Sequence, residues 1–503
     1  MSGTPGAGGS APSLAGAVFR GAMVMFALRF AVRAVGLVSI MFTARLLTPA
    51  DFGVIGTAAI VIGLFDILRR TGAGEGLIRL KEIDREHVET AWTINLTVCA
   101  VVSAGLFVSA PLAAQLLNEP RLEEVLRVMC FLPVIDAFVS PGGSLFMRNM
   151  EFRREFILRF SQKVVATTLT VIGAFVTRDY WGLVGGMLAG SMVFTVVSYF
   201  LYPFRPRLHV RRLHDFLGFS AWSFLQGLAS YVALTIDEII VRRVAPTEVF
   251  GLYHTSRDLS RVFVSEFVAP AAAALLPGLA RLQAEPRRFA RAARAAAGAG
   301  AIAAVACGAG VALTAHEVTG LLLGPGWDGA APFLALAAVG GAAQTMAGLH
   351  RGILAAGNRA DLSAILWVVR AVVLLVTLPL AGWLGGPTAV ALAFAAISIL
   401  LTLADYAIIF DRLGDRGAVV AIFARPVLAG LGMAALLWAL PLPTGLPLAA
   451  VAAAKVGLGA AAYSGVLLGL WLLRGRPDGA ESALLHRMPR FIGRALLPRA
   501  ATT

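Results

Sequence analysis

The chain is a succession of about fourteen long apolar runs, and this pattern limits its possible folds more than any other feature of its 503 residues. A helix needs roughly 20 apolar residues to cross a bilayer, and only helices and closed barrels satisfy their own backbone hydrogen bonds in lipid. Membrane strands are shorter and alternate strictly, which these runs do not. With 58% apolar and 14% charged residues, a water-soluble or disordered chain is excluded. The sequence therefore predicts an all-α integral membrane protein.

The predicted spans lie between charged residues or breaks marked by Pro and Gly. They cover residues 21–47, 53–78, 91–117, 125–147, 156–176, 181–201, 216–241, 249–276, 294–314, 329–351, 362–383, 387–410, 418–440 and 446–473. Residues 1–12 lack the charged region of a signal peptide, and we expect residues 1–20 to form a flexible cytoplasmic tail. The basic composition of residues 474–503 predicts either an amphipathic helix on the anionic inner leaflet or a solvated tail.

The basic residues are distributed unevenly between the two sides of the predicted bundle. Of 43 Lys and Arg residues, 31 fall in connections on one side, in the N-terminal tail or in the C-terminal tail, and only 6 fall on the other side. The positive-inside rule then places both termini on the cytoplasmic side of the membrane. Insertion accounts for most of the net charge of +14, so we expect no nucleic-acid partner.

Motifs for metal binding and catalysis are missing from the sequence. Cys99, Cys130 and Cys307 are far apart, which predicts neither a disulfide framework nor a zinc cluster. His316 and Glu317 are not followed by the second histidine of a zinc motif, and no phosphate-binding loop of an ATPase occurs. We therefore expect no metal site and no enzymatic activity.

A turn recurs near the start of each half of the chain. Residues 45–54 read RLLTPADFGV and residues 242–252 read RRVAPTEVFGL, so that Pro, an acid, an aromatic residue and Gly follow in the same order. Because six predicted spans separate the copies, the repeat is parallel, and the halves are related by an axis along the membrane normal. This predicts two six-helix lobes around a central cavity, at 21–201 and 216–410, joined by a linker at 202–215 and followed by two helices at 411–473.

Several arginines lie within predicted spans, where a charged side chain normally faces a water-filled cavity or a partner. Arg29 and Arg33 in the first span, and Arg257 and Arg261 in the eighth, are each four residues apart and share a helix face. One pair from each lobe, with Arg370 as a weaker addition, would form a cationic cavity suited to phosphate oxygens. Two alternatives stay open: Arg29 and Arg33 could snorkel to the interface, and Arg261 could pair with Asp258.

Acidic residues at similar depth are candidates for coupling to H+ or Na+. Asp136 is the first candidate because no basic residue lies at helical spacing from it; Asp66 and Asp405 are the others. Some acids, including two of these candidates, are also expected to form ion pairs. These predicted pairs are Asp66 with Arg69 and Arg70, Glu238 with Arg242, and Arg370 with Asp405.

The two turns, together with the loop RNMEFR at residues 148–153, resemble those of bacterial oligosaccharide flippases of the multidrug/oligosaccharidyl-lipid/polysaccharide exporter superfamily. The likeness covers about residues 20–470. It implies alternating access and transfer of undecaprenyl-pyrophosphate-linked repeat units to the outer leaflet, for exopolysaccharide, capsule or O-antigen. It also implies a cationic cavity, contact with membrane lipids, and a polysaccharide polymerase and co-polymerase as partners.

Three alternatives to this function stay open at this point. They are a flippase for a lipid-linked peptidoglycan precursor, a cation-coupled multidrug exporter of the same fold, and a membrane scaffold that transports nothing. A drug exporter should line its cavity with acids, because its substrates are cations. A scaffold would need no charge at membrane depth.

Overall fold

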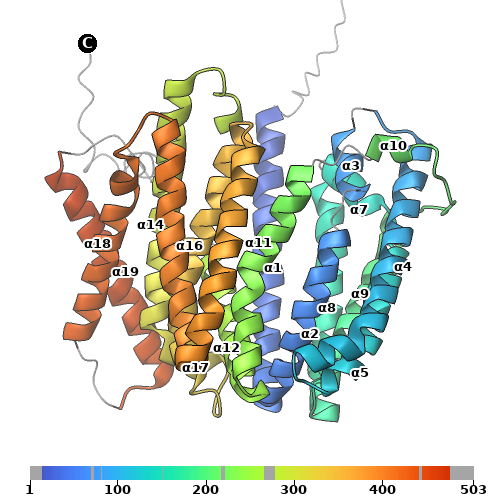
Figure 1. Cartoon of the computed structure of the whole chain (residues 1–503), viewed down its shortest axis with the longest axis horizontal. Coiled ribbons are helices and arrows are strands. Elements are labelled where there is room, and N and C mark those ends of the chain that lie inside the picture. Colours follow the sequence, from blue (N-terminus) through green and yellow to red (C-terminus); the bar gives the residue numbers. More distant parts are fainter. Residues whose placement is uncertain are drawn as a thin grey trace, which may run out of the picture. The chain divides into compact units, whose positions relative to one another are not determined.

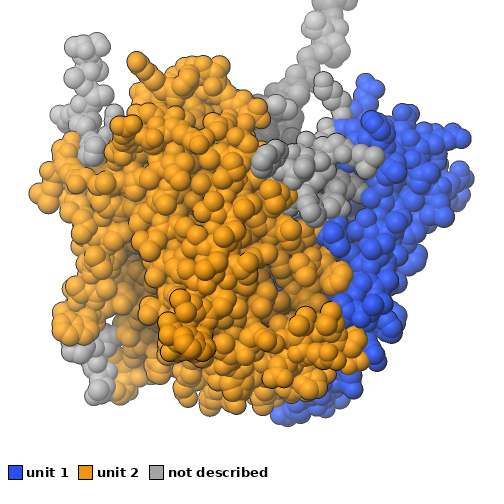
Figure 2. Space-filling model, in the orientation of Figure 1, with its two compact units in different colours: residues 1–43, 68–110, 124–219 blue, residues 44–67, 111–123, 220–503 orange. Residues whose placement is uncertain are grey.

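The fold is helical throughout the part of the chain that the computed structural model describes, which is residues 14–69, 73–80, 82–149, 151–216, 221–265, 278–440 and 445–475. Within these residues nine helices are long and apolar enough to cross a membrane, or ten with one bent pair counted as a span. The predicted all-α membrane fold is confirmed, whereas fourteen spans stay a prediction. The chain forms two compact units, unit 1 (residues 1–43, 68–110, 124–219) and unit 2 (residues 44–67, 111–123, 220–503) (Figure 2).

Unit 1 contains a closely packed pair of long helices. Its helices, some continuing into unit 2, are α1 (Leu14–Leu46), α3 (Ala73–Arg79), α4 (Arg85–Leu116), α5 (Arg121–Met129), α6 (Phe131–Ala137), α7 (Gly142–Arg148), α8 (Phe152–Thr177), α9 (Trp181–Leu201) and α10 (Leu213–Phe216). Helices α8 and α9 lie side by side (Figure 1). A Cβ on Gly186 would lie 1.8 Å from Thr170 Oγ1, so this contact requires glycine.

The run predicted as one span at 125–147 is broken. Helices α5 and α6 cover its first part, and α7 follows after a bend of 57°. The break covers residues 138–141 and includes Pro141, which cannot donate a backbone hydrogen bond. Non-helical backbone at membrane depth is tolerated where it is buried in protein or lines a cavity. We therefore expect this break to be buried or to line a cavity.

Unit 2 holds most of the second half of the chain. Its helices are α2 (Pro49–Arg69), α11 (Ala221–Val244), α12 (Thr247–Ser260), the π-helical turn η1 (Arg261–Ser265), α14 (Pro286–Leu313), α15 (Ala315–Leu322), α16 (Ala330–Ala356), α17 (Ala360–Arg412), α18 (Ala418–Ala439) and α19 (Leu448–Leu473). Helix α17 is interrupted at Gly385 and Gly386, the second with φ 65°. This confirms the predicted break between spans 362–383 and 387–410.

The two copies of the repeated turn pack against each other in unit 2. A Cβ on Gly53 would lie 2.2 Å from the carbonyl oxygen of Thr247, and a Cβ on Gly251 would lie 1.7 Å from that of Pro49. Each glycine therefore contacts the first turn of the other copy's helix, and no larger residue fits at either position. The division into lobes at 21–201 and 216–410 stays a prediction.

Arginines at matching positions of the two turns bind neighbouring loops in unit 2. Arg45 donates a hydrogen bond to the carbonyl of Leu321 over 3.0 Å. Arg242 donates to the carbonyl of Asn118 over 2.9 Å and pairs with Glu119 at 3.1 Å. Both acceptors lie at or just beyond the C-terminus of a helix, where carbonyls lack intrahelical partners. The repeated turns are thus fixed by backbone contacts and by these two arginines.

Candidate functional site

Unit 1 encloses a polar cavity of about 380 Å³ beside the broken span. Its walls come from the end of α2, from α3, α4, α8 and α9, and from the segment that joins α6 to α7. Its polar and aromatic lining residues are Arg69, Trp92, Asn95, Asp136, Ser140, Ser144, Arg159, Gln162 and Phe194. Such concave sites with a few convergent polar groups are typical of ligand binding.

An ion pair and an amide hold the broken span at the cavity. Arg69, the last residue of α2, pairs with Asp136 over 2.8 Å, and the two side chains are 26% and 22% exposed. Asn95 of α4 donates hydrogen bonds to the carbonyls of Asp136 and Ala137. These carbonyls end α6, and that of Asp136 also accepts a hydrogen bond from the backbone N–H of Val139, so Asn95 links α4 to the end of α6.

Helix α8 adds a basic face to the same unit. Arg159 and Lys163 lie one turn apart, and Arg159 is 53% exposed although it pairs with the buried Glu155. Lys163 lies beside α1, because its Cε is 3.4 Å from the position a Cβ on Gly36 would take. The charge of Arg33, an exposed residue of α1, acts on Lys163. Arg33 and Lys163 thus form a second basic region of this unit, but neither residue lines the cavity.

The cavity offers groups for both a phosphate and a sugar. Arg69, Arg159 and Asp136 give its lining a net positive charge. Guanidinium groups bind phosphate oxygens through charge-assisted hydrogen bonds. Amide and hydroxyl side chains both donate and accept, which suits sugar hydroxyls; Asn95, Gln162 and Ser144 supply them. The arrangement is thus suited to a polar, anionic ligand.

The arginines predicted for the eighth span lie in a different environment, in unit 2. Arg257 is 2% exposed; its Nε lies 3.0 Å from a carboxylate oxygen of the fully buried Asp237, and its guanidinium stacks 4.5 Å from the ring centre of Phe394. It does not face a wet cavity in this structure, contrary to the expectation. Arg261 is 44% exposed and pairs with Glu238 at 2.9 Å and with Asp258 at 3.2 Å. The alternative pairing of Arg261 with Asp258 is confirmed.

The remaining predicted pairs have mixed outcomes. The Arg370–Asp405 pair is confirmed at 2.7 Å, and both residues are buried. The prediction that Glu238 pairs with Arg242 is wrong, because Glu238 contacts His254 on α12 and Arg261 at the start of η1, whereas Arg242 contacts Glu119. Two charges at helical spacing do not pair when packing turns them toward different helices.

Two predicted site residues, Arg29 and Asp66, are less fully defined. Arg29 lies in α1, but its side chain lies outside the described part of the chain, and so does Arg70. Asp66 is half-buried near the end of α2 and is not among the residues lining the cavity. Arg69, one of the two partners predicted for Asp66, pairs with Asp136, and the pairing of Asp66 itself stays a prediction. Among the described residues no group of three or more His, Cys, Asp or Glu side chains is placed to hold a metal ion.

Sequence reasoning missed Arg69 and Arg159 as lining residues of the cavity, having counted them only as positive charges on one side. One signal was present: Arg159 and Lys163 have the same four-residue spacing as the arginine pairs that were chosen. Arg69 gave no such signal, because its partner Asp136 is distant in the sequence. Asp136, in contrast, was chosen from the sequence and does line the cavity.

The multi-pass helical fold is shared with solved structures of membrane transporters. A solved structure of "Lipid II flippase MurJ, inward closed conformation" superposes with a TM-score of 0.69 at 11% identity, covering 89% of this chain and 99% of that one. An inward-facing multidrug resistance MATE family transporter of the MOP superfamily gives a TM-score of 0.60 at 14% identity, over 77% of this chain and 99% of that one. At these identities the likeness shows the fold alone.

Sequence comparison identifies the family. Residues 42–332 match the family described as "Polysaccharide biosynthesis protein", and the chain belongs to this family. Similar proteins include "Lipopolysaccharide biosynthesis protein WzxC" of Escherichia coli K12, 22% identical over 74% of this chain and 76% of that one. "Succinoglycan biosynthesis transport protein ExoT" of Rhizobium meliloti 1021 is 23% identical over 51% of this chain and 52% of that one. The resemblance to polysaccharide flippases is confirmed, and the chain belongs with transporters rather than enzymes.

Proposed function

We propose that this protein moves an undecaprenyl-pyrophosphate-linked oligosaccharide repeat unit from the cytoplasmic to the outer leaflet of the bacterial inner membrane. The names of its relatives supply the polysaccharide context, and the transporter fold supplies the means. The excess of basic residues on one side supports an orientation with both termini in the cytoplasm. We expect a polysaccharide polymerase and co-polymerase to use the translocated product.

The observation that carries the proposal is the polar cavity of unit 1. Its net positive lining suits a pyrophosphate, and its amides and hydroxyls suit sugars. The same charge disfavours the cationic substrates of a multidrug exporter. A lipid-linked peptidoglycan precursor shares both chemical groups, so the two flippase functions differ only in the glycan. We expect the partly exposed Arg33 and Arg261 and the neighbouring Arg29 to contact the substrate as it moves.

Alternating access would require a contact that opens and closes, and the repeated turns offer one. The reciprocal contacts of Gly53 with Thr247 and of Gly251 with Pro49 join the starts of α2 and α12. By the predicted topology these turns lie on the outer side of the membrane. We therefore assign them the role of an outer gate, which separates when the substrate leaves.

If transport is coupled to an ion, Asp136 is a better candidate for binding that ion than Asp66 or Asp405. Its carboxylate lines the cavity, so protons or Na+ can reach it, and it pairs with Arg69. Asp405 is buried against Arg370. Protonation of Asp136 would weaken its ion pair with Arg69. The variant Asp136→Asn should accordingly remove any dependence of transport on the ion gradient.

A matched pair of α8 variants tests the proposed function. Arg159 lines the cavity and pairs with Glu155, whereas Arg154, on the same helix and also half exposed, pairs with Glu151 and does not line the cavity. In a strain that lacks the chromosomal gene, Arg159→Gln should reduce polysaccharide export at least tenfold and leave lipid-linked repeat units in the inner leaflet. Arg154→Gln should export normally.

A second cavity variant and a measurement of protein amount complete this test. Because Arg159→Gln leaves the carboxylate of Glu155 without its arginine, Gln162→Leu serves as a second cavity variant that keeps every ion pair. The amount of each variant in the membrane is measured by immunoblot. Normal export by both cavity variants would refute the role of the cavity, and accumulation of a peptidoglycan precursor instead of the repeat unit would refute the substrate.

A further inference from the structure

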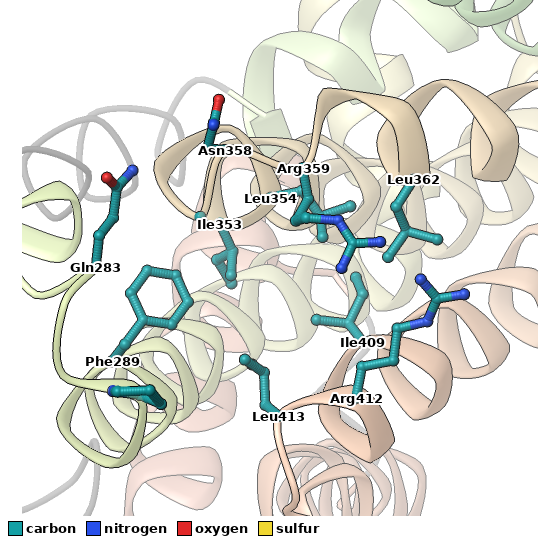
Figure 3. Close-up of a pocket in the computed structure, with 12 residues that line it drawn as sticks. Gln283, Phe289, Ile353, Leu354, Asn358, Arg359, Leu362, Ile409, Arg412 and Leu413 are labelled. Atoms are coloured by element: carbon teal, nitrogen blue, oxygen red, sulfur yellow. The ribbon is translucent and has the colours of Figure 1, made fainter.

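A second pocket, of about 300 Å³, lies in unit 2 at one end of its helices (Figure 3). It is formed by the start of α14, the end of α16 and both ends of the interrupted α17. Gly357, Asn358 and Arg359, which connect α16 to α17, form part of its rim. This pocket shares no lining residue with the cavity of unit 1, and the transport proposal does not use it.

The pocket has an apolar side and a cationic side. Its apolar lining residues are Phe289, Ile353, Leu354, Leu362, Ile409 and Leu413. The guanidinium groups of Arg359 and Arg412 both lie near Ile409 and Leu362, whereas Phe289 and Gln283 lie at the opposite side (Figure 3). A ligand that fits must therefore combine a hydrocarbon portion with an anionic group.

The charge of the pocket is not neutralised by its own lining. Among the twelve lining residues Arg359 and Arg412 are charged and none is acidic. Arg359 is 45% exposed and pairs with Asp361, outside the lining, at 3.2 Å, which leaves N–H groups available for a ligand. Two guanidinium groups turned toward one space repel each other unless an anion lies near both.

The position of the pocket in the sequence indicates the leaflet that it faces. Arg359 and Arg412 belong to the basic connections that the positive-inside rule places in the cytoplasm. The cytoplasmic leaflet carries anionic lipids, and basic pockets between transmembrane helices on this side bind their head groups. The chain's own C-terminal tail is an unsuitable occupant because it is itself basic, with Arg487, Arg490 and Arg494.

We propose that this pocket binds the phosphate head group of an anionic bilayer phospholipid, with Arg359 and Arg412 contacting the phosphate and the apolar side contacting the start of the acyl chains. Its volume is at the lower end of ligand pockets, which range over about 300–1,000 Å³, and fits a head group rather than an oligosaccharide. The bound lipid joins the two ends of α17 and thereby stabilises the interrupted helix.

Native mass spectrometry of the full chain in neutral detergent tests this site, with phosphatidylglycerol, phosphatidylethanolamine and inorganic phosphate as probes. The wild-type chain should retain phosphatidylglycerol about tenfold more than phosphatidylethanolamine. The double variant Arg359→Gln/Arg412→Gln should lose this preference. Arg416→Gln is the matched control, because Arg416 lies in the next loop, is 89% exposed and does not line the pocket; this variant should keep the preference.

A third variant, Leu413→Trp, fills the pocket while it keeps both arginines, so it decides the question should the double variant fail to fold. It should lower phosphatidylglycerol retention at least fivefold. Unchanged retention in Leu413→Trp or in a folded double variant would overturn the proposal. Displacement of the lipid by equimolar inorganic phosphate would overturn it as well, because the site would then recognise a free anion.

Discussion

Two groups of charged residues within the bundle differ in how they are solvated. In unit 1, Arg159 and Arg69 line a cavity and remain 53% and 26% exposed, although each pairs with an acidic residue. In unit 2, Arg257 is 2% exposed and is enclosed by Asp237, the carbonyl of Leu234 and the ring of Phe394. An arginine at membrane depth therefore marks a ligand site only where solvent reaches it.

The energetic difference follows from the cost of burying charge. Desolvating two ions is expensive, and removal of one partner leaves the other charged and buried. Arg257 and Asp237 are in this position, so their pair serves to hold α11 to α12. At the cavity of unit 1 water remains available to the charged groups, so an arginine can exchange its partner for a ligand at small cost.

The largest expected effect is on stability, in unit 2. Arg257→Gln leaves Asp237 buried without its counter-charge and should lower the free energy of unfolding by about 3–5 kcal/mol. Arg261→Gln, at a half-exposed arginine one turn further on, should cost less than about 1 kcal/mol. Thermal unfolding in detergent measures both. A stable Arg257→Gln variant that fails to transport would show instead that Arg257 contacts the substrate, which would end the contrast between the two regions.

The next largest effect concerns the repeated turns. Gly251→Ala places a Cβ where the carbonyl of Pro49 lies, and the forced shift should cost about 1–3 kcal/mol and reduce transport about tenfold. Gly227→Ala on α11 is the control, because nothing lies within 4 Å of the added Cβ. Flipping of a labelled lipid-linked glycan in proteoliposomes measures the effect. Equal rates for the two variants would contradict the role of the turns as a gate.

The smallest effect is a pH dependence at Glu119, in the loop that holds the second turn. Burial raises the pKa of Glu119, but hydrogen bonds from Arg121 and Thr247 and the charges of Arg121 and Arg242 outweigh it and hold the pKa below the ordinary 4.5. This contribution to stability is present above pH 4.5 and is lost as the pH falls through the lowered pKa. Glu119→Gln should cost about 1 kcal/mol at pH 7.

The measurement is the difference in melting temperature between wild type and Glu119→Gln from pH 7 to pH 3, which should shrink on acidification. Glu248→Gln, at an exposed acid of the same turn, should show no such difference. A constant difference over the whole range would mean that the charge of Glu119 contributes nothing to the stability of the turn.

The sequence predicts the helices better than it predicts their partners. Apolar runs and positive charge define the spans, and the break in α17 is visible as Gly385, Gly386 and Pro387. The break between α6 and α7 had an equivalent signal in Ser140 and Pro141, but the apolar run around it concealed the interruption.

The site was predicted only in part, because helical spacing reports neighbours on one helix and nothing about the facing helix. This spacing identified the pair of Asp258 and Arg261. It could not identify Arg69 as the partner of Asp136, or Asp237 as that of Arg257, because these pairs join different helices. Asp136 was found because a charge without a local partner needs a distant partner or a cavity, and it has both.

The central claim, that the cavity of unit 1 binds the phosphate of a lipid-linked glycan, is tested most directly by equilibrium binding of undecaprenyl pyrophosphate to the purified full chain. One charge-assisted contact is worth about 1.5–3 kcal/mol, so Arg159→Gln should weaken binding tenfold or more, whereas Arg154→Gln should bind like wild type. Equal affinity of all three proteins would contradict the claim.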